Sequence, residues 1–277
     1  MDSRVALIKT FYRGLPTDRA KLETTAYGFD LIAQLQARGI ELEYGELTIS
    51  GVLHKYKLTR IIPEQMDQLL SWHVAKLGNV CLYFDQSANP ILAFNLDDNR
   101  AINSTGSAGN TGNVGNVGNV ESTAEVELAT RTLVAKLEEL QCPPLVIASG
   151  RGYHVWCRLQ AAVANPQLYR FMIHLGAAVL LAVRQHGLDP NRVKLNLYPD
   201  IRIQDLVSLR LFGSEHARNR VFSRVRAGNT LLDEAGSWAH FEEHLAHRTI
   251  ASHVFAEACR AVAGERESGA RSDRPSV

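Results

Sequence analysis

The stretch Ser149-Gly150-Arg151-Gly152-Tyr153-His154-Val155-Trp156 is the most informative part of this chain. An apolar run precedes it at residues 144–148, and apolar and polar residues alternate after it. This pattern predicts two strands joined by a glycine-containing turn, with His154 pointing out of the sheet. The glycines leave room for a charged ligand near the backbone, and Ser149 and Arg151 supply a hydroxyl and a guanidinium beside it. These groups suit phosphate, although an ordinary tight turn could contain the same residues.

Two further segments carry groups that suit phosphate or metal chemistry. Upstream, residues 91–98 predict a strand in which Asn95 and Asp97 share one face, while Asp98 points to the other. Downstream, Asp200 is followed by a compact set of serine, histidine and arginine residues, namely Arg210, Ser214, His216 and Arg218. Six arginines against two acids lie between residues 201 and 226, which predicts a basic strip beside the site.

In this order the segments resemble the motifs of the catalytic subunits of archaeo-eukaryotic primases and of the related primase-polymerases. Asn95-Leu96-Asp97 resembles the family's strand with two acidic residues, and Ser149 to His154 resembles its Ser-Gly-x-Gly-x-His turn. Asp200 and the residues from Arg210 onward resemble its third motif. The resemblance covers roughly residues 80–226. It implies an RRM-like catalytic lobe joined to an amino-terminal αβ lobe.

The same resemblance implies a DNA primase or polymerase that joins nucleoside triphosphates on a single-stranded DNA template. Asp97 and Asp200 would hold two Mg²⁺ or Mn²⁺ ions, which stabilise the attacking and leaving oxygens of the displacement. His154, Ser149 and Arg151 would bind the triphosphate, with the other phosphate-binding groups at Arg210, Ser214, His216 and Arg218. Asp205 is the alternative third acid. A helicase or an accessory replication subunit is a candidate partner.

One position departs from the family pattern. Asn95 stands where the family has its first acid, and an amide oxygen is a neutral ligand that adds no charge toward two cations. Asp98 could replace that acid if the strand twists or bulges. The alternative is a catalytically degenerate protein that keeps the primase fold and binds nucleic acid or nucleotide.

Composition bounds the remaining properties. The chain has 277 residues, 45% of them hydrophobic and 21% charged, as expected of a globular protein with a substantial core. We expect no signal peptide, no membrane span and a cytoplasmic location. The four cysteines are far apart in the sequence and are expected to be reduced, without a zinc site. A net charge of +1 argues against tight sequence-independent attachment to DNA.

Hydrophobic periodicity and capping signals predict an α/β (α+β) protein. We expect helices at residues 17–38, 63–78, 122–140 and 168–186, strands within residues 43–60, and a hairpin that joins residues 80–84 to 91–96. The predicted division is an amino-terminal αβ lobe at 1–79, a catalytic lobe at 80–235, a carboxy-terminal helix at 236–263 and an unstructured tail at 264–277. Repeated Gly-Asn triplets predict a flexible insert at 103–120.

A short pattern near the carboxy terminus suggests a different function. Residues 240–244 read His-Phe-Glu-Glu-His, which matches the H-x-x-E-H pattern of inverted zinc peptidases. A helix would place both histidines on one face. Because such short matches arise easily by chance, a zinc peptidase is the lesser alternative.

Overall fold

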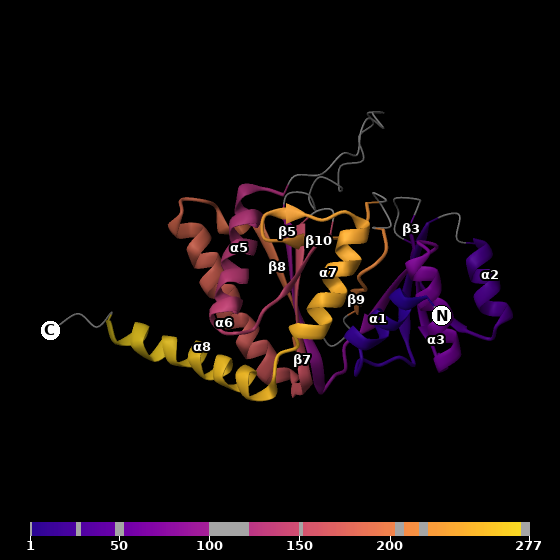
Figure 1. The fold of residues 1–277 in the computed structure, drawn as a ribbon, viewed down its shortest axis with the longest axis horizontal. Helices are drawn as coiled ribbons and strands as arrows, with labels where there is room; N and C mark the ends of the chain where they lie inside the picture. Colours follow the sequence, from indigo (N-terminus) through magenta and orange to yellow (C-terminus); the bar gives the residue numbers. More distant parts are fainter. Residues whose placement is uncertain are drawn as a thin grey trace, which may run out of the picture.

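The computed structural model describes residues 2–25, 29–47, 53–99, 122–149, 152–202, 208–215 and 221–272 (Figure 1). It is a mixed protein of two antiparallel sheets with helices packed on them, so the predicted α+β class is confirmed. The described helices are α1 (Ser3–Phe11), α2 (Phe29–Ala37), α3 (Pro63–Val74), α5 (Ala124–Glu139), α6 (Asn165–Gln185), α7 (Glu234–His247) and α8 (Ser252–Ser272), with a 3₁₀ turn, η3, at Pro190–Arg192.

The first sheet has five strands in the order β2-β3-β1-β4-β9. Its strands are β1 (Ala20–Thr25), β2 (Glu41–Leu47), β3 (Leu53–Thr59), β4 (Asn79–Tyr83) and β9 (Ser208–Arg210). Leu22, Leu58 and Leu82 alternate onto one face and pack with residues of α1 and α3 in a shared core. The residues that alternate with these leucines along each strand point to the opposite face, which is largely polar.

The second sheet has six strands in the order β11-β10-β6-β7-β5-β8. Its strands are β5 (Ala88–Asp98), β6 (Leu145–Ala148), β7 (Gly152–Ala164), β8 (Val193–Tyr198), β10 (Arg224–Ala227) and β11 (Thr230–Leu231). Leu92, Phe94 and Val155 face α5 and α6 in a second core. Alternate residues, including Ala93 and Trp156, join the core shared with the first sheet. The six-stranded sheet therefore lies between the helices α5 and α6 and the rest of the molecule (Figure 1).

The sheets do not follow the order of the chain. β4 pairs with β1, and β5 pairs with β7 and β8, so the predicted hairpin of residues 80–84 with 91–96 is wrong. Consecutive apolar strands look like a hairpin in the sequence, but every residue of β4 is buried and it forms an interior strand of the other sheet. β9 later returns to pair with β4. The division into domains stays a prediction.

Aromatic side chains join the two parts of the molecule. Phe11 of α1 lies 5.9 Å from Trp156 of β7 and 5.0 Å from Phe241 of α7, measured between ring centroids. Phe212, which follows β9, stacks on Phe241 at 4.8 Å. Because large aromatic rings bury much apolar area, this cluster fixes the first sheet, α7 and the six-stranded sheet against one another.

Several helices form where local signals predicted them. Pro63 occupies the first turn of α3, and the hydroxyl of Thr123 accepts the Val126 N–H at the start of α5. Gly187 ends α6 with φ of +75°, a left-handed conformation that favours glycine. Strands also form within residues 43–60 as predicted.

The helix predicted at residues 17–38 is wrong. Its first half is the strand β1, in which Ala20 and Leu22 are buried in the core while Lys21 and Glu23 alternate with them. This two-residue period is a strand pattern, and only the second half forms a helix, α2.

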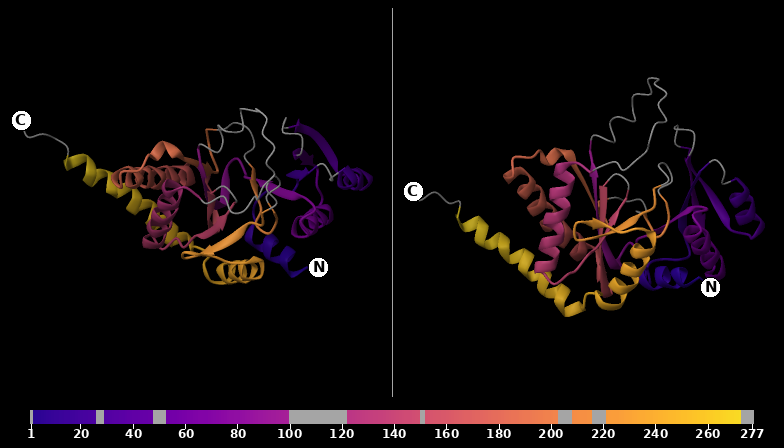
Figure 2. Two further views of the ribbon diagram at one scale, coloured as in Figure 1. Left: turned by 90° about the horizontal axis from the view of Figure 1, so that it is seen from above. Right: turned by 45° about the horizontal axis from the view of Figure 1, so that its top comes forward.

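The carboxy-terminal region holds two helices rather than one. The chain breaks between α7 and α8, where Ile250 hydrogen-bonds the backbone of Arg158 and Gln160 at the side of β7. α8 continues to Ser272, so the predicted unstructured tail is helical over most of its length, while residues 273–277 and the insert at 103–120 lie outside the described residues. α8 extends away from the body of the protein (Figure 2).

Among the described helices, α6 alone is long and apolar enough to cross a bilayer. Leu168, Phe171 and Met172 are nevertheless buried in the core formed with α5, α8 and the six-stranded sheet. Its apolar face thus belongs to the interior of the fold.

Candidate functional site

The central strands of the six-stranded sheet bring polar side chains of two predicted motifs together. Asn95 of β5 pairs with His154 of β7 on one side and with Asn196 of β8 on the other. Asp97 pairs with Gly152 and with Lys194 in the same way. Residues directly opposite one another in a sheet project from the same face. Asn95, Asp97, His154, Lys194 and Asn196 therefore share the face that is turned away from α5 and α6.

Asn95 and Asp97 contact each other directly. The amide group of Asn95 donates a hydrogen bond to Oδ2 of Asp97 at 3.1 Å, and Asp97 is only 6% exposed. The other amide atom, Oδ1 of Asn95, is buried without a hydrogen-bond partner in the described structure. Buried oxygens are nearly always satisfied, so this atom is available to a cation or to a donor on a ligand.

The donor set fits one divalent cation and not two. Asp97 supplies one carboxylate, and Asn95 and Asn196 supply neutral amide oxygens of the kind that Mg²⁺ and Mn²⁺ accept. Lys194, directly across from Asp97, adds a positive charge that disfavours a second cation. Within the described ranges no three His, Cys, Asp or Glu side chains form a metal-binding group.

Asp98 does not join this face. The pairing of β5 with β8 is regular from Ala93 to Asp98, and Asp98 lies opposite the buried Val193. The bulge in β5 lies between Asn89 and Ile91, well before the polar positions. The structure thus contains no twist that would bring Asp98 beside Asp97.

The sheet register also separates Asp200 from Asp97. Asp97 lies opposite Lys194, and the strand β8 ends at Tyr198, which lies opposite Ala93. Four strand residues separate the levels of Ala93 and Asp97, which corresponds to about 13 Å along the strand. Asp200 lies beyond that end. The structure therefore does not bring the two predicted acids together, and Asn196 is the β8 residue beside Asn95.

Asp200 is instead engaged by a neighbouring arginine. Its Oδ1 accepts hydrogen bonds from the backbone N–H and Nε of Arg202, and its Oδ2 accepts one from Nη2 at 2.7 Å. These hydrogen bonds lower the pKa of Asp200. The guanidinium of Arg202 also lies over the ring of Tyr169 at 5.4 Å. Asp205, the alternative acid, lies outside the described residues.

The strands on either side of the predicted turn, β6 and β7, pair antiparallel as expected. The backbone N–H of Ser149 donates to the carbonyl of Gly152 at 2.9 Å, and Ser149 is buried. Gly150 and Arg151 lie outside the described residues. A Cβ on Gly152 would lie 1.9 Å from the carbonyl oxygen of Leu96. Gly152 is thus required because β7 approaches β5 closely. This contact does not show the predicted role of leaving room for a ligand.

The second predicted phosphate-binding set is only partly described. Arg210 of β9 donates from Nη2 to the hydroxyl of the buried Ser223 at 3.3 Å, where the two sheets adjoin. Ser214 is buried, and its carbonyl accepts the N–H of Ser223. His216 and Arg218 lie outside the described residues.

Sequence reasoning missed a group of cations on the first sheet. Lys57, Lys21, Cys81 and Arg210 pair in turn across β3, β1, β4 and β9, which puts their side chains on one face. The next row on this face contains Lys55 and Glu23. Burial raises the pKa of Glu23, but Lys21, Lys55 and Arg210 outweigh it and lower that pKa overall. The signal was alternation, because residues 21–23 and 55–57 place a charge at every second position.

The cationic face and the Asp97 face approach each other at Tyr198. Burial is the main cause of the raised pKa of the Tyr198 hydroxyl, and the charge of Asp97 adds to it. Lys21 of the first sheet acts on the same hydroxyl in the opposite direction. Tyr198 therefore lies within electrostatic range of both an acid on one sheet and a cation on the other.

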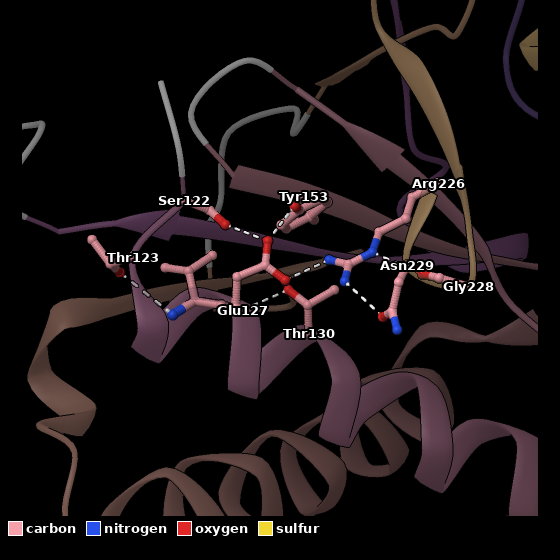
Figure 3. A network of polar contacts seen from close by, with 9 residues as sticks. Ser122, Thr123, Glu127, Thr130, Tyr153, Arg226, Gly228 and Asn229 are labelled. Atoms are coloured by element: carbon pink, nitrogen blue, oxygen red, sulfur yellow. Dashed lines mark hydrogen bonds and ion pairs between the residues drawn. The ribbon is translucent and has the colours of Figure 1, made fainter. Parts of the chain in front are cut away.

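Two arginines of the basic strip predicted between residues 201 and 226 are engaged in separate ion pairs. Arg202 is paired with Asp200, while Arg226 donates to Oε2 of Glu127 at 2.6 Å (Figure 3). Glu127 also accepts hydrogen bonds from Ser122 and from the hydroxyl of Tyr153. This network lies on the face of the sheet covered by α5, opposite the face of Asp97.

Comparisons with known proteins found likenesses in structure alone. No protein-family model matches the chain, and no curated protein matches it. The polymerase domain of Mycobacterium tuberculosis ligase D, in a complex with DNA, superposes with a TM-score of 0.45 at 13% identity, over 94% of this chain and 86% of that one. The AEP domain of the cyanophage S-2L primase-polymerase superposes with a TM-score of 0.34 at 12% identity, over 86% of this chain and 97% of that one. At these values neither likeness assigns an activity to this protein.

Proposed function

We propose that this chain is a primase-polymerase-type protein that binds a nucleoside triphosphate together with one Mg²⁺ or Mn²⁺ ion. The observation that carries the proposal is the sheet register, which surrounds the single carboxylate of Asp97 with Asn95, Asn196 and His154. The cation would contact the carboxylate of Asp97 and the unsatisfied amide oxygen of Asn95. When bound, it would neutralise phosphate charge on the nucleotide.

The cationic face of the first sheet supports the triphosphate as the ligand. Lys21, Lys55 and Arg210 lie on that face around Glu23, with which Lys21 forms an ion pair at 3.0 Å. Lys21 is also within electrostatic range of Tyr198 beside the Asp97 face. Several cations together can neutralise a triphosphate, as phosphate binding requires. Single-stranded DNA is the proposed template or partner, and the cytoplasm is the proposed location.

Template-directed nucleotidyl transfer is the second candidate function. Asp97 supports it, because this buried acid of β5 stands at the second acidic position of the motif that residues 95–97 resemble. Two-metal catalysis needs more negative charge than one carboxylate provides. We therefore expect binding to exceed catalysis: the protein should bind nucleotide with a divalent cation and incorporate it slowly or not at all.

Calorimetric titration with a nucleoside triphosphate, with and without Mn²⁺, tests the binding function. Asp97→Asn should abolish the effect of Mn²⁺ on nucleotide affinity while leaving the fold intact. Asp98→Asn, on the opposite face, should leave that effect unchanged. A protein that binds no triphosphate, or that loses the Mn²⁺ effect equally in both variants, would contradict the proposed site.

Restoring acids tests the second candidate. Labelled-nucleotide incorporation on primed and unprimed single-stranded DNA should be weak for the natural chain. The double variant Asn95→Asp with Asn196→Asp should raise it if the missing charge limits catalysis. Strong incorporation by the natural chain, equal to that of the double variant, would favour a full polymerase over a binding protein.

A further inference from the structure

A polar pocket lies at the β10–β11 edge of the six-stranded sheet, between α5 on one face and α7 on the other. It has a volume of about 320 Å³ and is bounded by α5, α7 and the turn between β10 and β11. It is lined by Arg131 and Glu138 of α5, Arg226 of β10, His240 and His244 of α7, and Arg248 just after α7. Its size is at the lower end of the range for small-molecule sites.

His244 is the unusual member of this lining. It is only 2% exposed, and neither Nδ1 nor Nε2 has a hydrogen-bond partner in the described structure. Buried polar atoms are almost always hydrogen-bonded. The ring therefore has no hydrogen-bond partner within the described protein, and a molecule bound at this wall of the pocket would supply one.

The charge of the lining identifies the kind of molecule. Three arginines line the pocket, of which Arg226 is already paired with Glu127, and Glu138 is the one acid in the lining. Within the part of the chain that the structure describes, Arg131 and Arg248 form neither an ion pair nor a hydrogen bond with a carboxylate. The excess of positive charge favours an anion and disfavours a metal ion.

The same arrangement removes the zinc-peptidase alternative. His240 and His244 share one face of α7, as the pattern predicted, but Glu243 is exposed and is not part of the lining. A zinc peptidase of this class needs that glutamate beside the metal. The described residues also contain no group of three metal ligands.

We propose that this pocket binds a phosphate monoester, with Arg131, Arg248 and His240 contacting the phosphate oxygens and His244 donating to one of them. The site is separate from the proposed nucleotide site, because its lining contains none of the residues around Asp97. Inorganic phosphate, a nucleoside monophosphate and the 5′-phosphate end of a nucleic acid share this chemistry. The volume accommodates more than a free phosphate ion.

The titration of His244 supports an anion. Burial, and then the nearby Arg248 and His240, lower its pKa to about 4, so the ring is neutral at pH 7. The charged or titratable groups that line the pocket around it are Arg131 and Glu138 from α5, Arg226 from β10, His240 from α7 and Arg248 just after α7. An anion bound beside His244 would raise that pKa, because opposite charge favours the charged ring.

The test uses the full chain carrying Asp97→Asn, so that the proposed nucleotide site is disabled. Inorganic phosphate, adenosine monophosphate, and one oligonucleotide with and without a 5′-phosphate are titrated while the histidine ring signals are followed by NMR. We expect at least one phosphate probe to shift the His244 signals. Arg248→Gln and Arg131→Gln should each weaken that probe by about tenfold or more, the effect expected for loss of a charge-assisted hydrogen bond. Arg170→Gln, an exposed arginine on α6, is the matched control and should change nothing.

The outcomes separate the ligand sources. Equal affinity for all phosphate probes identifies a phosphate ion site, a preference for the monophosphate identifies a nucleotide, and a preference for the phosphorylated oligonucleotide identifies a strand end. Absence of binding by every probe, or equal weakening in Arg170→Gln, overturns the proposal. Because His244→Ala could disturb the fold, the two exposed arginines carry the test. A phosphate probe that binds the natural chain but not Asp97→Asn would belong to the proposed nucleotide site instead.

Discussion

Two polar networks on opposite faces of the six-stranded sheet differ in how they are satisfied. On the face covered by α5, Glu127 accepts hydrogen bonds from Ser122, Tyr153 and Arg226 (Figure 3). On the opposite face, Asn95 donates to Asp97, but its own oxygen has no partner in the described structure. Groups that satisfy one another stabilise the fold, whereas an unsatisfied group costs stability until a ligand arrives. Of these two networks, the one at Asn95 is therefore the one available for binding.

The largest expected effect tests the register that assigns residues to each face. In Gly152→Ala, the added Cβ would lie 1.9 Å from the backbone oxygen of Leu96, so β5 and β7 must move apart. We expect a loss of about 4 kcal/mol or more in the free energy of unfolding, measured with urea. Gly264→Ala in α8, where nothing lies within 4 Å, is the control and should change stability by about 1 kcal/mol or less. Equal stabilities of the two variants would contradict the register of β5 and β7, and with it the assignment of residues to the two faces.

Two buried histidines extend the comparison to pH. Burial lowers the pKa of both His73 and His244 to about 4, below an ordinary value of 6.5. Both rings fold in the neutral form, so their stabilising contribution is complete above pH 6.5 and is lost as the pH falls toward 4. Each difference corresponds to about 3 kcal/mol, to be measured as urea stability against pH. A stability that stays flat between pH 7 and pH 4 would contradict both assignments.

Replacing each ring separates the paired histidine from the unpaired one. Nδ1 of His73 accepts the Val80 N–H and its Nε2 lies 3.0 Å from the Phe212 carbonyl, whereas the His244 nitrogens have no such partners. At pH 7, His73→Phe should lose about 2 to 3 kcal/mol, because it leaves two buried backbone groups unsatisfied. His244→Phe should lower the free energy of unfolding by about 1 kcal/mol or less, because it leaves no hydrogen-bond partner unsatisfied. Similar losses in both variants would show that hydrogen bonding does not distinguish them.

A smaller effect is expected from the Glu127 network. Glu127→Gln keeps the shape of the side chain but leaves the guanidinium of Arg226, which is 10% exposed, without its counter-charge. Glu127 itself is partly exposed, so we expect a loss of about 1 to 2 kcal/mol, discounted for solvent screening. The double variant Glu127→Gln with Arg226→Gln should recover part of that loss. A double variant less stable than the sum of the single changes would contradict the ion pair as the stabilising contact.

The smallest effect on stability is expected on the opposite face. Asn95→Asp places a second carboxylate beside Asp97, and the repulsion should cost about 1 kcal/mol without metal. Added Mn²⁺ should reverse this loss, because a doubly charged pair binds a cation more tightly than the natural site. The melting temperature measured against Mn²⁺ concentration gives the result. A variant that Mn²⁺ stabilises no more than the natural chain would show that this face does not hold the cation.

Local signals predicted the local structure well. The turn before His154, the proline at the start of α3 and the threonine cap of α5 each act within a few residues, so the sequence alone locates them. The strand carrying Asn95 and Asp97 was likewise predicted with the correct face for each residue.

Long-range pairing was not predictable from the same signals. Asp200 fits the family's third motif in spacing, but the residue that pairs with Asn95 is Asn196, and register depends on contacts between distant strands. The predicted hairpin of residues 80–84 with 91–96 was wrong for the same reason, because the sequence of an apolar strand does not indicate which sheet the strand joins. The pocket around His244 brings α5 together with β10 and α7, which follow α5 by about 100 residues in sequence. The histidine pattern alone therefore suggested a metal, because it did not show the neighbouring Arg131 of α5.

The return of β9 to the first sheet has a consequence for how the protein forms during translation. The four strands β1 to β4 are complete once residue 83 has been made, yet the edge of β4 gains its partner only with Ser208–Arg210. Until then the ribosome holds a chain whose β4 edge presents unpaired backbone groups. Open strand edges favour pairing with other chains. Slow synthesis between these segments should therefore lower the yield of soluble protein more than the same delay placed after residue 210.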